Sequence, residues 1–312
     1  DLLKDSGSIF LQIGSENVHR VRNLLDEVFG NDCFVAQITF RVKSPLSVSD
    51  IARTTDFILW YAKDKTKLKF RQPLTPKKLE EHPEFTMALD KKRRVYYRSK
   101  VSTNNEGYRF FTAQNLASSG YTPSCTFPFT VSGKTFQSPK GKSWKTNLEG
   151  MERLSKAGRL QPLKTSLRWR YFFDDAGNEV ITDVWTDTFA ASSKTYVVQT
   201  SESVIQRCIL MATDPGDLVL DPTCGSGTTA YIAEEWGRRW ITIDTSRVAL
   251  ALARTRLMGA RYPYFLLMDS KEGQQKVAEI TRTVPRDTPT YGHIRQGFVY
   301  KRASRITLKS IA

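Results

Sequence analysis

The feature that most constrains this chain is a glycine-rich loop that follows a short apolar run. The run Asp217–Asp221 has the composition of a buried strand, and Asp221-Pro-Thr-Cys-Gly-Ser-Gly-Thr-Thr229 leads from it into a helical pattern. Gly225 and Gly227 let the backbone pass close to a ligand, where a Cβ would obstruct it. No Lys follows the second glycine, as a phosphate-binding P-loop requires, and Ala230 replaces the third glycine of the dinucleotide pattern. The loop therefore predicts a ligand site at the carboxyl edge of a parallel sheet.

A second acid lies in register with this loop. The apolar run Trp240–Asp244 ends at Asp244, which follows Gly227 by 17 residues. A carboxylate at that strand end can accept both hydroxyls of a ribose, and Asp221 can meet an ammonium group of the same ligand. The plainer alternative is a tight strand-to-helix turn with a helix-capping acid after it. Because both acids are in register, the pattern favours a nucleoside pocket.

Hydrophobic periodicity divides the chain into segments. Strands are expected at 8–13, 34–42 and 56–62, and Ser15 is expected to cap a helix that ends at Gly30. Ser203 is expected to cap a further helix, after which strands and helices alternate, and Ser246 is expected to cap the helix at 247–258. The segment 305–309 is strand-like. We predict an α/β fold with a Rossmann-like, doubly wound and mostly parallel sheet and an inserted basic lobe. Along the chain we expect a catalytic half at 1–70, the insertion at 71–190, a cofactor half at 191–275 and a C-terminal extension at 276–312.

The inserted lobe carries most of the net charge of +15. Residues 71–170 contain 20 Lys and Arg against 7 Asp and Glu, together with twelve aromatic residues. Cations neutralise phosphates and aromatic rings stack on bases, so the lobe suits nucleic acid, although a solvated charged face would have the same composition. The residues expected to contact phosphates are Lys91, Lys92, Arg93, Arg94, Lys140, Lys142 and Lys145.

Other classes of site are not supported by the sequence. The four cysteines form no C-x-x-C pair, and the three histidines form no ligand pattern, which argues against zinc or a disulfide framework. No apolar run reaches membrane-spanning length and no signal peptide opens the sequence. We expect a cytoplasmic protein without a metal site or a membrane partner.

The loop and its context resemble a known family. Pro215-Gly-Asp-Leu-Val-Leu220 and the glycine-rich loop are similar to the cofactor motif of S-adenosylmethionine-dependent DNA amino-methyltransferases. The order along the chain resembles the permuted β class, which includes the modification subunits of type III restriction systems. Residues 3–14, 17–30, 56–63 and 183–187 resemble segments that precede the cofactor motif in that class.

The resemblance implies a function and a set of site residues. It implies methyl transfer from S-adenosylmethionine to an exocyclic amine of adenine, or less favourably of cytosine, in double-stranded DNA of a bacterium or archaeon. Possible partners are a restriction subunit and a second copy of the chain. In the loop, Ser226 and its neighbours would cradle the methionine part, and Asp244 would hold the ribose. Gln199 and Thr200, before the helix that precedes the loop, would cover the carboxylate end. The implied cofactor-binding residues are Gln199, Thr200, Asp221, Pro222, Thr223, Cys224, Gly225, Ser226, Gly227, Thr228 and Asp244.

The family's catalytic tetrapeptide, Asp-Pro-Pro-Tyr or a close variant, does not occur in the sequence. Motif order would place it before Asp1, so we expect a piece of a longer enzyme that is inactive alone, and we predict no catalytic residue. Two alternatives stay open: an enzyme that acts on RNA or a small molecule, and a DNA-binding component that has lost catalysis and keeps the fold.

Overall fold

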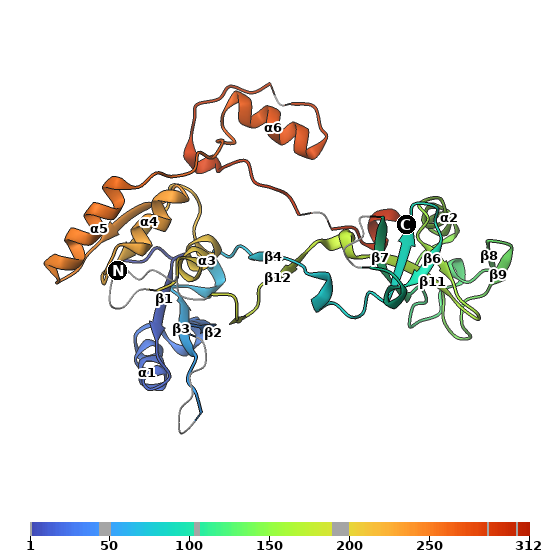
Figure 1. Cartoon of the computed structure of the whole chain (residues 1–312), viewed down its shortest axis with the longest axis horizontal. Coiled ribbons are helices and arrows are strands. Elements are labelled where there is room, and N and C mark those ends of the chain that lie inside the picture. The colour runs from blue at the N-terminus through green and yellow to red at the C-terminus, as the bar shows by residue number, and fades with distance from the viewer. Residues whose placement is uncertain (1, 44–50, 103–106, 189–199, 286, 304) are drawn as a thin grey trace. The chain divides into compact units, whose positions relative to one another are not determined.

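A computed structural model describes residues 2–43, 51–102, 107–188, 200–285, 287–303 and 305–312. The chain forms two compact units (Figure 1). The first comprises residues 1–74 and 180–301, and the second comprises residues 75–179 and 302–312. The predicted C-terminal extension is thus divided, because its last eleven residues belong to the unit that the insertion forms.

The first unit contains an α/β layer arrangement. Its four-stranded sheet has the order β1-β3-β2-β13, antiparallel except where β13 pairs with β2. A separate parallel pair is formed by β14 and β15. The α/β class is confirmed, but the strands described do not form one continuous parallel sheet. The elements are β1 (Ser8–Ile13), α1 (Val18–Phe29), β2 (Phe34–Arg41), β3 (Thr55–Ala62), β13 (Val184–Trp185), α3 (Glu202–Ala212), β14 (Leu218–Asp221), α4 (Thr228–Glu235), β15 (Arg239–Thr242), α5 (Arg247–Gly259) and α6 (Lys271–Thr281).

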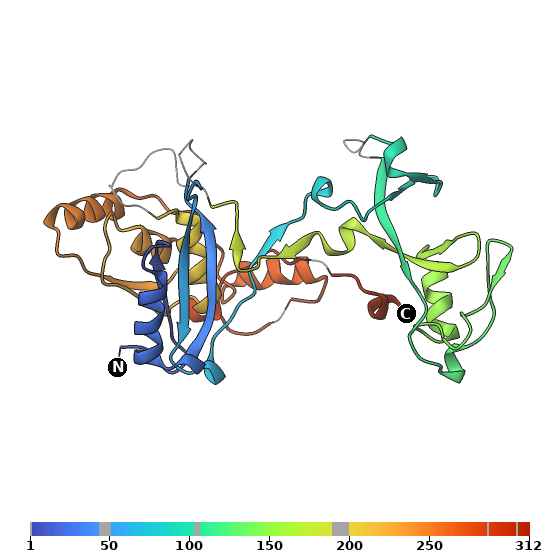
Figure 2. The ribbon, with the colours of Figure 1, turned by 90° about the horizontal axis from the view of Figure 1, so that it is seen from below.

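Helices cover both faces of the four-stranded sheet because β3 is apolar on both sides. Leu59 and Tyr61 pack against Leu25 of α1, which lies along the sheet in Figure 2. On the opposite face, Trp60 belongs to a cluster with Cys208 of α3. A strand buried on both faces reads as an unbroken apolar run rather than an alternating one. Helix α3 also packs against α4, and these contacts place the end of α3 beside β14 and β15.

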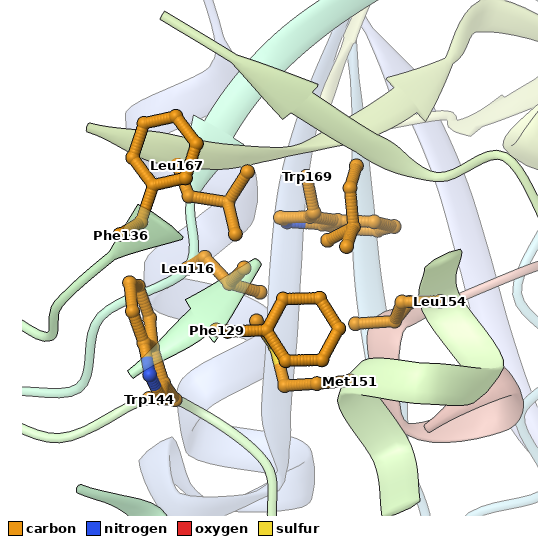
Figure 3. Close-up of a cluster of buried hydrophobic side chains, with 9 residues drawn as sticks. Leu116, Phe129, Phe136, Trp144, Met151, Leu154, Leu167 and Trp169 are labelled. Atoms are coloured by element: carbon orange, nitrogen blue, oxygen red, sulfur yellow. The ribbon is translucent and has the colours of Figure 1, made fainter. Parts of the chain in front are cut away.

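The second unit is built on a five-stranded antiparallel sheet with the order β10-β11-β7-β5-β6. Its main core joins this sheet to α2 through Trp169, Met151 and Leu154, which face one another in Figure 3. The elements are β5 (Met87–Asp90), β6 (Val95–Tyr97), β7 (Tyr108–Asn115), β8 (Phe129–Val131), β9 (Lys134–Phe136), α2 (Leu148–Lys156), β10 (Leu160–Pro162), β11 (Leu167–Phe172) and α7 (Leu308–Ile311), and β4 (Leu74–Pro76) pairs with β12 (Asn178–Val180).

Several local predictions are wrong. The strand-like segment 305–309 contains the start of α7, whose Leu308 and Ile311 pack on the core of the second unit. Helix α1 begins after Asn17 rather than Ser15. Helix α3 begins after Ser201 rather than Ser203. Neither of these two helices has a side-chain cap, because packing of their apolar faces fixes where they begin.

Candidate cofactor-binding site

The glycine-rich loop connects β14 to α4, as the sequence predicts. Gly225 has φ +51° and Gly227 has φ +78°, values that non-glycine residues rarely adopt. A Cβ on Gly227 would lie 2.8 Å from the Cβ of Ala253 in α5. The loop is closed by hydrogen bonds from the backbone N–H of Gly227 to the carbonyl of Cys224 and from the N–H of Cys224 to the carbonyl of Ile243. Only a glycine at 227 lets α5 lie this close to the loop.

Asp244 lies beside the loop, after β15. One carboxylate oxygen accepts the backbone N–H of Gly225 at 2.9 Å, and the other accepts that of Ser246 at 2.8 Å. These N–H groups, Ser246 first, hold the pKa of Asp244 below its ordinary value. The structure therefore brings together the two features that the sequence places 19 residues apart, the first glycine and the ribose-site acid. The predicted cap is also confirmed, because the Ser246 hydroxyl accepts the N–H of Ala249.

The remaining loop residues differ in how they face solvent. Asp221 is half-buried, and its carboxylate accepts the backbone N–H of Thr223 at 3.0 Å. Pro222 and Thr223 are exposed, whereas the side chains of three other predicted contacts are buried, those of Cys224, Ser226 and Thr228. These three residues could reach a ligand through the loop backbone, while Asp221 and Asp244 present carboxylates at neighbouring strand ends.

The segment before α3 forms part of the same unit. Gln199 lies outside the described residues. The Thr200 hydroxyl donates to the Gln12 side chain at the end of β1, and the Gln12 amide donates to a carboxylate oxygen of Asp56 at 3.2 Å. Sequence reasoning missed Gln12 and Asp56 as site candidates. Their signal was a polar residue at the end of one apolar strand and at the beginning of another.

Arg256 of α5 connects the segment before α3 to the loop. Its guanidinium donates to Glu202 at 2.5 Å and to the Thr228 hydroxyl at 3.0 Å, and it lies 4.7 Å from the ring centre of Tyr231. Glu202 begins α3, two residues after Thr200, so Arg256 ties the two predicted cofactor segments together. Sequence reasoning missed it as well. The sequence carries no signal for it, because its partners Thr228 and Glu202 lie 28 and 54 residues away in the chain.

The chemistry of these residues fits S-adenosylmethionine. The fit rests on the tight glycine turn at the end of β14 and on the two carboxylates at neighbouring parallel strand ends. Asp221 suits an ammonium group, and Asp244 suits the two hydroxyls of a ribose. Among the residues that the structure describes, no group of His, Cys, Asp or Glu side chains could hold a metal ion, and no helix is long and apolar enough to span a membrane.

The predicted phosphate contacts lie in two segments of the second unit. Residues 91–94 form the turn between β5 and β6, where the Arg94 side chain donates to Asp90 at 2.8 Å. Lys140, Lys142 and Lys145 follow β9 in an exposed loop. Arg94 is thus partly neutralised, whereas the side chains of Lys91, Lys92 and Arg93 have no ion-pair partner in the described part of the chain.

Comparison with known proteins identifies the family. A model of the N6/N4 DNA methylase family, described as "DNA methylase", matches residues 1–255. The chain belongs to this family. Its members use S-adenosylmethionine, in agreement with the cofactor that the loop indicates.

Two relatives show the extent of the likeness. The type II methyltransferase M.EcaI of Enterobacter cloacae is 27% identical over 271 residues, which cover 84% of this chain and 56% of the relative. The Mod subunit of the type III restriction-modification enzyme StyLTI of Salmonella typhimurium is 24% identical over 274 residues, which cover 80% of this chain and 39% of the relative. The chain thus spans roughly half the length of these proteins, or less. The crystal structure of an M1.HpyAVI–SAM complex covers 82% of this chain and 76% of its own, at 16% identity and a TM-score of 0.40.

Proposed function

We propose that this chain is the cofactor-binding and DNA-binding part of a site-specific DNA methyltransferase of the permuted β class. The observation that supports this most directly is the joint hydrogen bonding of Gly225 and Asp244 at the end of the parallel strands. Bound S-adenosylmethionine supplies an electrophilic methyl group to an exocyclic amine, which we propose to be N6 of adenine rather than N4 of cytosine. A restriction subunit is proposed as a partner of this chain, on the basis of its similarity to the StyLTI Mod subunit.

The proposed contribution of each residue follows from its place in the site. Asp244 would accept the ribose hydroxyls, Asp221 would accept the ammonium group, and the segment at Thr200 would close over the methionine end. Methyl transfer from a sulfonium needs an aligned nucleophile and dispersal of charge at the amine more than it needs a strong base. The target amine lies inside the duplex, so the base must be flipped out to reach the cofactor. No residue of this chain is proposed to perform that step.

The first test is calorimetric titration of the chain with S-adenosylmethionine. Asp244→Ala removes the proposed ribose contacts and should lower affinity at least about tenfold, since hydrogen bonds to a charged group contribute about 1.5–3 kcal/mol. Asp32→Ala is the matched control, because Asp32 is an exposed acid of the same unit with no side-chain partner among the described residues. Equal affinities for the two variants would contradict the site.

The second test is labelled methyl transfer to duplex DNA by the complete gene product and by this chain alone. We expect transfer to adenine by the complete protein and none by the chain. Transfer to cytosine would correct the target base. If the complete protein binds the cofactor and DNA without transfer, the chain belongs to a DNA-binding component that has lost catalysis.

A further inference from the structure

One face of the five-stranded sheet in the second unit carries arginines around two buried phenylalanine rings. In the register of β7, β10 and β11, Arg168 lies opposite Asn115 and Gln161, and Arg170 lies opposite Ala113. Directly opposed residues point to the same side of a sheet, and alternate residues of one strand do the same. The arginine face is therefore defined by Arg109, Arg168 and Arg170, with Phe111 and Phe172 among them. Trp169 and Phe110, on the other face, belong to the two cores.

Two of these arginines are held in place by the sheet itself. The guanidinium of Arg109 lies 3.9 Å from the ring centre of Phe172, and that of Arg170 lies 5.5 Å from the ring centre of Phe111. Both rings are almost completely buried. Arg170 also donates to the Gln161 side chain at 3.0 Å and to the carbonyl of Gly158 at 3.1 Å. Binding an anion here would cost less side-chain entropy than it would on freely moving lysines.

The charge of the arginine face is only partly compensated. Arg109 pairs with Asp174 at 2.9 Å. Arg168 has no hydrogen-bond or ion-pair partner in the described part of the chain, and Arg170 has no carboxylate partner there. Burial, and then the nearby charge of Arg93, lower the pKa of Arg170. Arg93 comes from the turn between β5 and β6, so a second part of the lobe adds to the positive potential at Arg170.

These charges distinguish the face from an ordinary solvated surface. Solvated arginines extend away from one another into water, whereas the side chain of Arg170 is half-buried over the ring of Phe111. No Asp or Glu occupies a described strand position on the Arg168 side of β7, β10 or β11. Like charges held together in partly desolvated positions are unfavourable until an anion reaches them. A planar guanidinium matches the geometry of a phosphate, to which it can donate two hydrogen bonds.

We propose that the arginine face binds the phosphate backbone of duplex DNA, with Arg168 and Arg170 as the contacting cations. This inference rests on the proposed function, because it takes DNA as the substrate, and it adds the surface of the lobe on which the duplex lies. Phosphate contacts fix the position of a protein on DNA without reading sequence. The lysine loop after β9 then contributes less to affinity than the sheet does.

The test measures binding of the full chain to a duplex by fluorescence anisotropy at several salt concentrations. Arg168→Gln should lower affinity about tenfold near 0.1 M salt and reduce the slope of log K against log salt by about 1, the change expected for one lost phosphate contact. Arg168→Lys should keep the slope and recover part of the affinity, because it keeps the charge and loses the planar fork. The matched control is Lys156→Gln on α2, an exposed cation without a side-chain partner in the described chain, which should leave both quantities unchanged.

Failure of the inference and failure of the proposed function give different results. If the wild-type chain binds duplex DNA and Arg168→Gln behaves like Lys156→Gln, the arginine face is refuted and the proposed function is retained. If the wild-type chain binds the cofactor but no duplex DNA, both are refuted. Photocross-linking of wild-type protein to DNA avoids any effect of substitution on folding. Cross-links in peptides that contain residues 168–170 are expected, and cross-links confined to residues 134–145 would overturn the proposal.

Discussion

Replacing Gly227 by alanine tests whether the loop is shaped by its contact with α5. The backbone at Gly227 has φ +78°, and an L-residue in the left-handed region costs about 1–2 kcal/mol. The new Cβ would lie 2.8 Å from the Cβ of Ala253 and 3.2 Å from its Cα. Overpacking of this kind costs about 1–3 kcal/mol more. The opening free energy of this region should fall by about 2–5 kcal/mol, a large part of a typical domain's stability.

Hydrogen exchange measured on peptides of α4 and α5 reports this opening free energy locally. At about 1.4 kcal/mol for each factor of ten, exchange should accelerate about 30- to 3,000-fold. Gly292→Ala is the matched control, since Gly292 has φ +65° in the same unit and a Cβ there would meet nothing within 4 Å. Hydrogen exchange in the peptides around residue 292 should accelerate only about 5- to 30-fold, which is the effect of backbone strain without a steric contact.

A second substitution separates contact from strain. Ala253→Gly removes the atom that the new Cβ would meet, at a cost of about 1 kcal/mol for a glycine inside a helix. The loss of opening free energy that Ala253→Gly causes should be smaller in the Gly227→Ala variant than in the wild-type protein. The difference, which is the coupling energy of the two sites, should be about 1–3 kcal/mol. Equal losses for Gly227→Ala and Gly292→Ala, or no coupling to Ala253→Gly, would refute the explanation that α5 shapes the loop.

Two further predictions concern Arg256 of the first unit and the thiols of the chain. Arg256→Ala should lower the affinity for S-adenosylmethionine about tenfold and leave the circular dichroism spectrum unchanged, because it removes the link between the segment before α3 and the loop. The control variant Arg254→Ala should bind like the wild-type chain. Both affinities are measured by calorimetry, and equal values would contradict the role of Arg256. Burial raises the pKa of Cys208 to about 12. At pH 8 a thiol reagent should therefore label the half-buried Cys33 and Cys125 and leave Cys208 unlabelled until urea unfolds the chain, as mass spectrometry would show. Rapid labelling of Cys208 in the folded chain would show that its thiol is not enclosed.

The sequence by itself determined the loop and its immediate surroundings. A strand, two glycines that need positive φ and a helix are encoded within a dozen residues, and the Ser246 cap is encoded within four. These features depend on backbone conformations and spacings that neighbouring residues decide. The sequence also identified the basic lobe, because charge and aromatic content need no coordinates.

Only the tertiary structure decided which distant residues support the site. Gln12 meets Thr200 across 188 residues of chain, and Arg256 meets Glu202 across 54. No periodicity carries such pairings, since they depend on how helices pack on the sheets. For the same reason the short segment 305–309 could not be assigned, because α7 is held by its packing on the core of the second unit and not by its own propensity.

The arginine face shows the same division. Alternation within β11 places Arg168 and Arg170 on one side of their strand, which the sequence pattern contains. That Arg109 and the buried ring of Phe111 share this side follows from the pairing of β7 with β11, whose residues Ala113 and Arg170 lie 57 positions apart in the chain. Local sequence fixes which way a side chain points along its strand, whereas long-range strand pairing decides which charges become neighbours and so what the surface can bind.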